Sequence, residues 1–308
     1  MTTTQTTTTQ QTEQTQEENR WGGSGKGLIT FLRFFPKKGW SRLLSLLVTT
    51  RFPRFFSQWV MRRFIAAYQL DMDEAALPLE EYPTIGALFT RALKENTHSI
   101  DHTPLVAVSP ADGHVLNSGR LQAGRLIQCK GHDFDVQDLL GDPEQAERFR
   151  GGSWCTVYLS PRDYHRVHHP IEGKIVRADY VNGALWPVNR AAVQNVKHLF
   201  CVNERVITYV ESPLGSVATI MVGATSVGHI TMAFDNRLVA NKGHRSQNRE
   251  YDSPIEIKRA DELGTFHLGS TAIILFANPD VKLEALIDGQ PIRIGMPIAR
   301  GTQASSET

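Results

Sequence analysis

Residues 266–276 read FHLGSTAIILF, a Gly-Ser-Thr turn followed at once by an apolar run. The β-branched and apolar residues at 271–276 predict a buried β-strand. The residues around Ile274 continue as strand with no helical pattern after them, so Ser270 does not sit in the strand–turn–helix elbow of a conventional serine hydrolase. The stretch therefore places a serine at the mouth of a buried strand.

The chain from about Ala107 onward has the same β-rich texture. Short β-branched runs lie between Gly, Pro and Asn breaks, at residues 154–159, 174–181, 205–210 and 217–222. A hairpin turn is expected at residues 211–215, and small helices at 142–150 and 189–199. Because there is no βαβ rhythm and no internal repeat, we expect an α+β fold, with N-terminal amphipathic helices followed by a largely antiparallel β-sheet domain.

The charge is unevenly distributed along the 308 residues, although the formal net charge is only +1. Residues 21–70 contain nine Lys or Arg and no Asp or Glu, whereas the rest holds 24 basic and 32 acidic residues, a balance of −8. This asymmetry marks residues 21–70 as a candidate interaction region.

Aromatic side chains are interleaved with these basic residues. On a helical wheel one arc carries Phe55, Phe56, Trp59, Val60 and Phe64, and Arg63 interrupts that arc. Such a pattern is typical of helices that lie on an anionic membrane, where each cation near the surface contributes about 1 kcal/mol. A basic helical hairpin packed on the core and a nucleic-acid patch are the alternatives that the pattern leaves open.

Other features of the composition restrict the class of protein. Residues 1–20 are rich in Thr and Gln and are expected to be a disordered tail. The three cysteines form no CxxC pair, which argues against a zinc site or a disulfide framework. No apolar run approaches the roughly 18 residues that a transmembrane helix needs.

Three segments carry candidate catalytic side chains. They read SPADG at residues 109–113, SPRDYHRVHHP at 160–170 and FHLGSTA at 266–272. Taken singly, they are explained by a turn-forming Asp, by surface histidines or a metal site without recognisable partner spacing, and by a tight turn. Taken together, Asp112, His168 and Ser270 are the parts of an activated serine nucleophile.

The same segments give the chain a family resemblance over about residues 39–300. It is similar to the bacterial type of phosphatidylserine decarboxylase, which uses a pyruvoyl group made from its own backbone. The resemblance rests on several motifs that occur in one order, at residues 109–113, 129–132 with 139–141, 158–168, 194–196 with 203–205, 222–228 and 268–271.

The resemblance implies that the chain cuts itself between Gly269 and Ser270. His168, oriented by Asp112, would remove the proton of Ser270 Oγ, and the alkoxide would attack the Gly269 carbonyl. Ser270 would become the covalent pyruvoyl cofactor, which forms a Schiff base with the amine of phosphatidylserine. His165 is the candidate for proton handling in the decarboxylation, and no role is assigned to His169.

The resemblance also sets expectations for organisation and partners. Residues 21–100 would form a membrane-docking region and residues 101–308 the catalytic domain, divided into a β chain (1–269) and an α chain (270–308). The expected partners are phosphatidylserine, an anionic membrane surface on the cytoplasmic side of the cell membrane, and a second αβ unit in a homodimer; neither a metal nor a nucleic acid is expected. A serine hydrolase that uses Asp112, His168 and Ser270, and a non-enzymatic membrane-adsorbing module, are the competing hypotheses.

Overall fold

The computed structural model describes residues 37–129, 132–188, 190–225, 229–238, 240, 245–267 and 270–302. The predicted tail at residues 1–20, residues 21–36 of the predicted docking region and Gly269 lie outside the described residues. Within these limits the molecule is an α+β protein with its longer helices near the N-terminus and a β-rich body, so the predicted fold class is confirmed.

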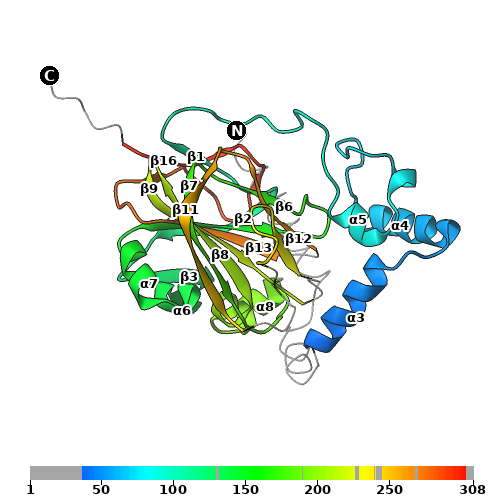
Figure 1. Cartoon of the computed structure of the whole chain (residues 1–308), viewed down its shortest axis with the longest axis horizontal. Coiled ribbons are helices and arrows are strands. Elements are labelled where there is room, and N and C mark those ends of the chain that lie inside the picture. Colours follow the sequence, from blue (N-terminus) through cyan, green and yellow to red (C-terminus); the bar gives the residue numbers. More distant parts are fainter. Residues whose placement is uncertain are drawn as a thin grey trace, which may run out of the picture.

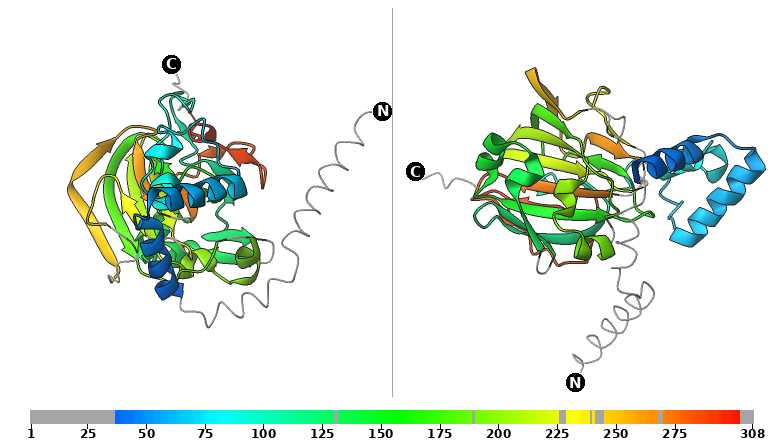
Figure 2. Two further views of the ribbon diagram at one scale, coloured as in Figure 1. Left: turned by 90° about the vertical axis from the view of Figure 1, so that its right-hand side faces the viewer. Right: turned by 90° about the horizontal axis from the view of Figure 1, so that it is seen from below.

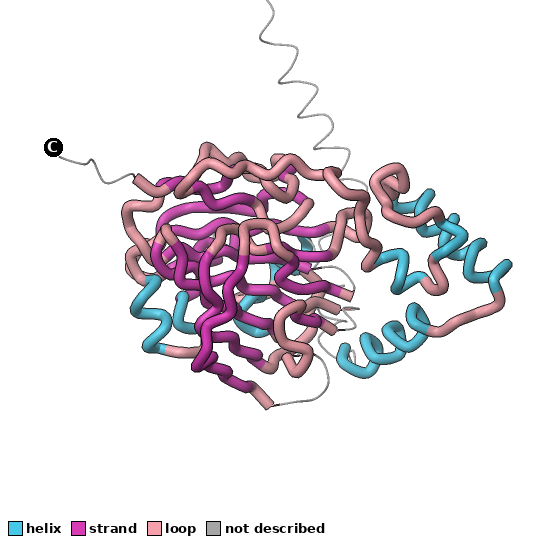
Figure 3. The backbone as a smooth tube through the Cα atoms, turned by 45° about the horizontal axis from the view of Figure 1, so that its top comes forward, coloured by secondary structure: helices cyan, strands magenta, loops and turns pink. Residues whose placement is uncertain are grey.

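An eight-stranded antiparallel sheet forms the centre of the β-rich body (Figures 1 and 3). Its strands, in spatial order, are β11 (Gln247–Ile257), β7 (Gly173–Val181), β8 (Arg205–Ser212), β9 (Gly215–Val222), β13 (Ser270–Phe276), β5 (Ser153–Leu159), β2 (Gly113–Arg120) and β15 (Pro291–Ile292). All five strands expected from the sequence are therefore present. The strand β13 pairs with β9 on one side and with β5 on the other. This central position explains why its sequence is apolar from Ala272 to Phe276.

Three smaller sheets complete the β structure. The first contains β10 (Ile230–Met232), β12 (Glu262–Phe266) and β6 (Arg166–His168). The second contains β1 (Val106–Val108), β16 (Pro297–Arg300) and β14 (Lys282–Leu283), and the third pairs β3 (Arg125–Cys129) with β4 (His132–Asp135). The first of these sheets matters for function, because two of the segments that join it to the central sheet lead to the candidate site residues His165 and Ser270.

Short helices pack against the central sheet and share its hydrophobic core. They are α6 (Val136–Leu140), α7 (Pro143–Phe149), α8 (Arg190–Asn195) and α9 (Leu199–Val202). Leu139, Phe149 and Phe200 are fully buried in one cluster with the apolar residues of the strands. The helix expected at residues 142–150 is confirmed. The single helix expected at 189–199 is wrong: α8 ends at Asn195, and His198 has a left-handed backbone (φ 54°), which a continuous helix does not allow.

The N-terminal helices project from one side of the β-rich body (Figure 2). They are α3 (Lys37–Thr49), α4 (Arg54–Tyr68), a 3₁₀ turn η1 (Leu79–Glu81) and α5 (Ile85–Phe89). Met61, Leu70, Tyr82 and Leu88 form a small core of their own. The strands β6 and β12 lie on the side of the body that faces these helices (Figure 1).

Candidate active site

Two chain crossings between sheets meet beside Ser270. Residues 160–165 carry the chain from β5 to β6, and residues 267–269 carry it from β12 to β13. The backbone N–H of Phe266 donates to the carbonyl of His165 at 2.9 Å, which ties the two crossings together. Ser270, the first residue of β13, is paired with Leu159, the last residue of β5. The backbone of Ser270 therefore begins next to the loop that carries His165.

His165 is held rigidly and without charge in this loop. Its side chain is fully buried, and its ring centroid lies 3.9 Å from that of Phe89 at the end of α5. Burial lowers the pKa of His165 to about 3. Since Nδ1 donates to the carbonyl of Asp163 at 2.8 Å, Nε2 carries the lone pair, and this buried atom has no hydrogen-bond partner among the residues that the structure describes. A neutral imidazole with a free acceptor is thus present at the crossing.

His168 has the same tautomer. It is the last residue of β6, and its Nδ1 donates to the carbonyl of Ala260 at 2.7 Å. Within the described ranges the buried Nε2 atom has no hydrogen-bond partner, and burial lowers the pKa of this imidazole from its ordinary value. The backbone N–H of His168 donates to the carbonyl of Pro110 at 2.8 Å, so β6 is attached to the loop that carries Asp112. His168 can therefore act as a base at neutral pH.

Asp112 has a different partner from the one expected. Its two carboxylate oxygens lie 2.8 and 2.9 Å from Nε2 of His98, and Oδ1 also accepts the backbone N–H of Ile294 at 2.9 Å. In the described part of the chain Asp112 makes no hydrogen bond to His168, whose Nδ1 is occupied by Ala260. The role predicted for Asp112, that of orienting His168, is therefore not carried by a direct hydrogen bond among the described residues; Nδ1 of His168 is held by a backbone carbonyl.

His98 is the site residue that the sequence did not reveal. It belongs to none of the three chemical segments, and no spacing rule connects it with Asp112. The ring of Tyr164 lies between the two histidines, with centroid distances of 6.2 Å to His98 and 5.8 Å to His168. Asp112, His98, Tyr164 and His168 therefore form one cluster, although the carboxylate and His168 are not in direct contact.

The loop geometry explains the SPADG segment. Gly113 follows Asp112 and begins β2, where a Cβ atom would lie 2.2 Å from the carbonyl oxygen of Tyr158 on β5. Glycine is required by this close approach of two backbones. Within the described ranges, no three His, Cys, Asp or Glu side chains are grouped as metal ligands.

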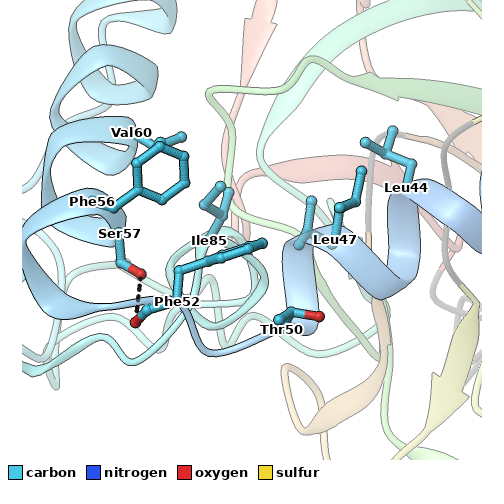
Figure 4. Close-up of a pocket in the computed structure, with 9 residues that line it drawn as sticks. Leu44, Leu47, Thr50, Phe52, Phe56, Ser57, Val60 and Ile85 are labelled. Carbon is cyan, nitrogen blue, oxygen red and sulfur yellow. Dashed lines mark hydrogen bonds between the residues drawn. The ribbon is translucent and has the colours of Figure 1, made fainter.

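An apolar groove lies between α3 and α4, close to this cluster. Figure 4 shows Leu44 and Leu47 of α3 opposite Phe56 and Val60 of α4, with Phe52 and Ile85 at its base. Ile85 is the first residue of α5, and the ring of Phe89, one helical turn later, packs at a tilt against His165. The short helix α5 thus connects the groove with the histidine loop.

Comparisons with known proteins all give one family for this chain. A family model described as phosphatidylserine decarboxylase matches residues 85–300. The chain is 40% identical over 268 residues to a phosphatidylserine decarboxylase proenzyme of Myxococcus xanthus, covering 87% of this chain and 95% of the relative. It is 40% identical to the proteins of the same name in Anaeromyxobacter sp. over 273 residues (88% and 96%) and in Pseudomonas putida over 274 residues (86% and 94%).

The matched family and the relatives are decarboxylases, so this α+β chain is an enzyme. With a match over residues 85–300 and relatives covered almost end to end, the chain belongs to the phosphatidylserine decarboxylase family. The family resemblance seen in the sequence is confirmed. The individual roles expected of Asp112, His165, His168 and Ser270 remain predictions.

Proposed function

We propose that this chain is a proenzyme that cleaves itself between Gly269 and Ser270 and then converts phosphatidylserine to phosphatidylethanolamine and CO2. The observation that carries the proposal is the state of His168: its tautomer is fixed by Ala260, and its buried Nε2 has no partner among the described residues. A base of this kind suits the activation of a serine hydroxyl.

Self-cleavage begins with a proton transfer to His168. Nε2 takes the proton of Ser270 Oγ, and the oxygen attacks the carbonyl carbon of Gly269. The peptide bond between the Gly269 carbonyl carbon and the Ser270 nitrogen then breaks, and the Ser270 nitrogen takes a proton. The Gly269 acyl group is now attached to Ser270 Oγ as an ester. Loss of the Ser270 Cα proton expels the Gly269 carboxylate, and water replaces the remaining amine, so that ammonia leaves and a ketone remains. An intramolecular nucleophile needs no binding step, and a positioned base contributes about 10²–10⁴ in rate.

The surroundings of Ser270 suit a pyruvoyl group. Such a group supplies an electrophilic carbonyl for the substrate amine and a sink for the electrons that CO2 leaves behind. The chain holds its carrier on the central strand β13, fixed from both sides by β5 and β9. His165 offers a buried Nε2 atom that can hold a proton near the reacting carbon. Its contact with Phe89 keeps water away from this atom.

The N-terminal helices are proposed to dock the enzyme on an anionic membrane. No helix in the described residues is long and apolar enough to cross a bilayer. The helices nevertheless expose large apolar side chains: Phe55 is 80% exposed, Trp59 57% and Leu46 63%. Basic residues accompany them, and Arg63 lies 5.8 Å over the Trp59 ring. This combination supports peripheral adsorption, with α5 leading from the membrane side to His165.

The experiment that tests the function is a conversion assay on purified protein. Wild type is expected to release CO2 from phosphatidylserine, and Ser270→Ala is expected to release none. Ser118→Ala, which removes a partly buried hydroxyl elsewhere on the central sheet, is the matched control and should keep its activity. Release of CO2 by Ser270→Ala would contradict the proposal, and so would a wild type that hydrolyses esters and is labelled at Ser270 by a fluorophosphonate.

A further inference from the structure

Arg91 is a buried cation that has no ion-pair partner among the described residues. It lies two residues after α5 and is 5% exposed. Its Nη2 atom donates to the carbonyl of Arg162 at 3.1 Å, whereas Nε and Nη1 are buried and have no hydrogen-bond partner in the described part of the chain. Burial lowers the pKa of this guanidinium from its ordinary value, although the group stays charged. A buried charge without a partner is costly, and proteins retain one mainly where a ligand supplies the missing partner.

The carboxylates whose fields reach Arg91 are all occupied by other groups. They are Asp112, Asp163 and Glu74. Asp112 binds His98 and the Ile294 N–H, and Asp163 accepts both the backbone N–H and the hydroxyl of Ser160 at 2.7 Å. Glu74 pairs with Arg293 at 2.7 Å. None of these three acids forms an ion pair with Arg91 in the part of the chain that the structure describes.

Arg91 is joined to both the apolar groove and the loop that carries His165. The helix α5 begins at Ile85 in the apolar groove, ends at Phe89 on the His165 ring, and is followed by Arg91. Arg162, which receives the Nη2 hydrogen bond, is three residues before His165 in the same crossing. In a phospholipid the phosphate joins the acyl chains to the reacting headgroup. One short segment of this chain likewise joins an apolar groove, a buried cation and the histidine loop.

We propose that Arg91 binds an oxyanion of the lipid substrate, and that this oxyanion is the phosphodiester. This inference rests on the proposed function. The headgroup has a second oxyanion, the carboxylate, but a cation that held it would stabilise the reactant more than the transition state, because negative charge leaves the carboxylate as CO2 forms. A phosphodiester keeps its charge throughout, and guanidinium nitrogens suit its oxygens.

The test compares Arg91→Gln and Arg91→Lys with wild type, and every value is normalised to the amount of cleaved chain. Binding of dihexanoyl phosphatidylethanolamine, which has the phosphodiester but no carboxylate, is measured by calorimetry. The KM for dihexanoyl phosphatidylserine and the inhibition constant of L-serine, which has no phosphate, are measured by assay. Arg120→Gln is the matched control, because this exposed arginine also donates to a backbone carbonyl, that of Pro279.

We expect Arg91→Gln to weaken phosphatidylethanolamine binding and raise the KM for phosphatidylserine by one common factor, about 10- to 100-fold. Arg91→Lys should lose less, and the inhibition constant of L-serine should stay the same in both. Unchanged phosphatidylethanolamine binding with a raised KM would overturn the proposal in favour of a carboxylate site. If Arg91→Gln does not fold, wild-type lipid binding by Arg91→Lys overturns it. Failure of wild type itself to cleave or to release CO2 would instead refute the proposed function.

Discussion

Both carboxylate oxygens of Asp112 lie within hydrogen-bond distance of a single atom, Nε2 of His98, at 2.8 and 2.9 Å. The pair is almost closed off from solvent, with side-chain exposures of 12% for His98 and 13% for Asp112. Asp112 belongs to the loop whose Pro110 carbonyl accepts the His168 backbone N–H. We expect His98 to influence His168 through the position of this loop, because Asp112 makes no hydrogen bond to the His168 ring among the described residues.

This relationship predicts that His98→Ala slows self-cleavage by about tenfold or more. Without His98 the buried carboxylate keeps only the Ile294 N–H, and an under-satisfied buried charge costs about 1–3 kcal/mol. The rate can be followed by electrophoresis after synthesis in a cell-free system. His102→Ala, which alters an exposed histidine of the same segment, is the control. Wild-type cleavage by His98→Ala would show that the pair has no part in the reaction.

The stability of the uncleaved chain is predicted to fall as the pH drops from 6.5 to 5. Burial lowers the pKa of His165 to about 3 and the pKa values of His169 and His267 to about 4. In this window the three histidines become protonated in the unfolded chain but stay neutral in the folded chain. Each histidine therefore lowers the unfolding free energy by roughly 2 kcal/mol at pH 5.

Urea titrations of Ser270→Ala at pH 7 and pH 5 measure this loss. Adding His169→Gln should reduce the difference between the two pH values by about 2 kcal/mol, because one buried imidazole is gone. Adding His102→Gln, at an exposed position, should leave it unchanged. An equal difference in all three proteins would contradict the assignment of the acid sensitivity to buried histidines.

The contact between Phe89 and His165 predicts a selective defect in turnover. Phe89→Leu keeps an apolar side chain but removes the aromatic ring that packs against the imidazole of His165. We expect CO2 release per cleaved chain to fall about tenfold, while the unfolding free energy falls by only about 1–1.5 kcal/mol. Phe134→Leu is the control, because Phe134 is equally buried but packs against Phe200. Equal turnover by the two variants would rule out this role of Phe89.

Membrane docking predicts that Phe55→Ala and Trp59→Ala each weaken binding to anionic vesicles by about tenfold. An aromatic side chain contributes roughly 1.5–3 kcal/mol when it leaves water. Ile287→Ala removes a side chain that is 69% exposed on the β-rich body and should bind as wild type does. Vesicle flotation measures the bound fraction at low and high salt. Binding that is insensitive to both substitutions and to salt would contradict docking through these helices.

The sequence predicted the strands well because β-branched runs, buried on both faces, leave few alternatives. The five strands and the hairpin at Pro213 and Leu214 follow from such local patterns. The break at His198 could not be predicted, because a left-handed histidine has no sequence signature. The same limit applies to the site. The motifs identified Asp112 and His168, but the pairing of Asp112 with His98 and the isolation of Arg91 arise from tertiary contacts.

The central claim concerns one covalent bond, between Gly269 and Ser270, and the intact mass of the purified protein tests it most directly. Self-cleavage predicts two polypeptides, residues 1–269 and residues 270–308. The smaller one should be blocked to Edman degradation by its N-terminal ketone. Ser270→Ala should give one full-length mass, and Ser118→Ala should give both fragments. A fully active wild-type protein with a single full-length mass and a free Ser270 hydroxyl would contradict the account.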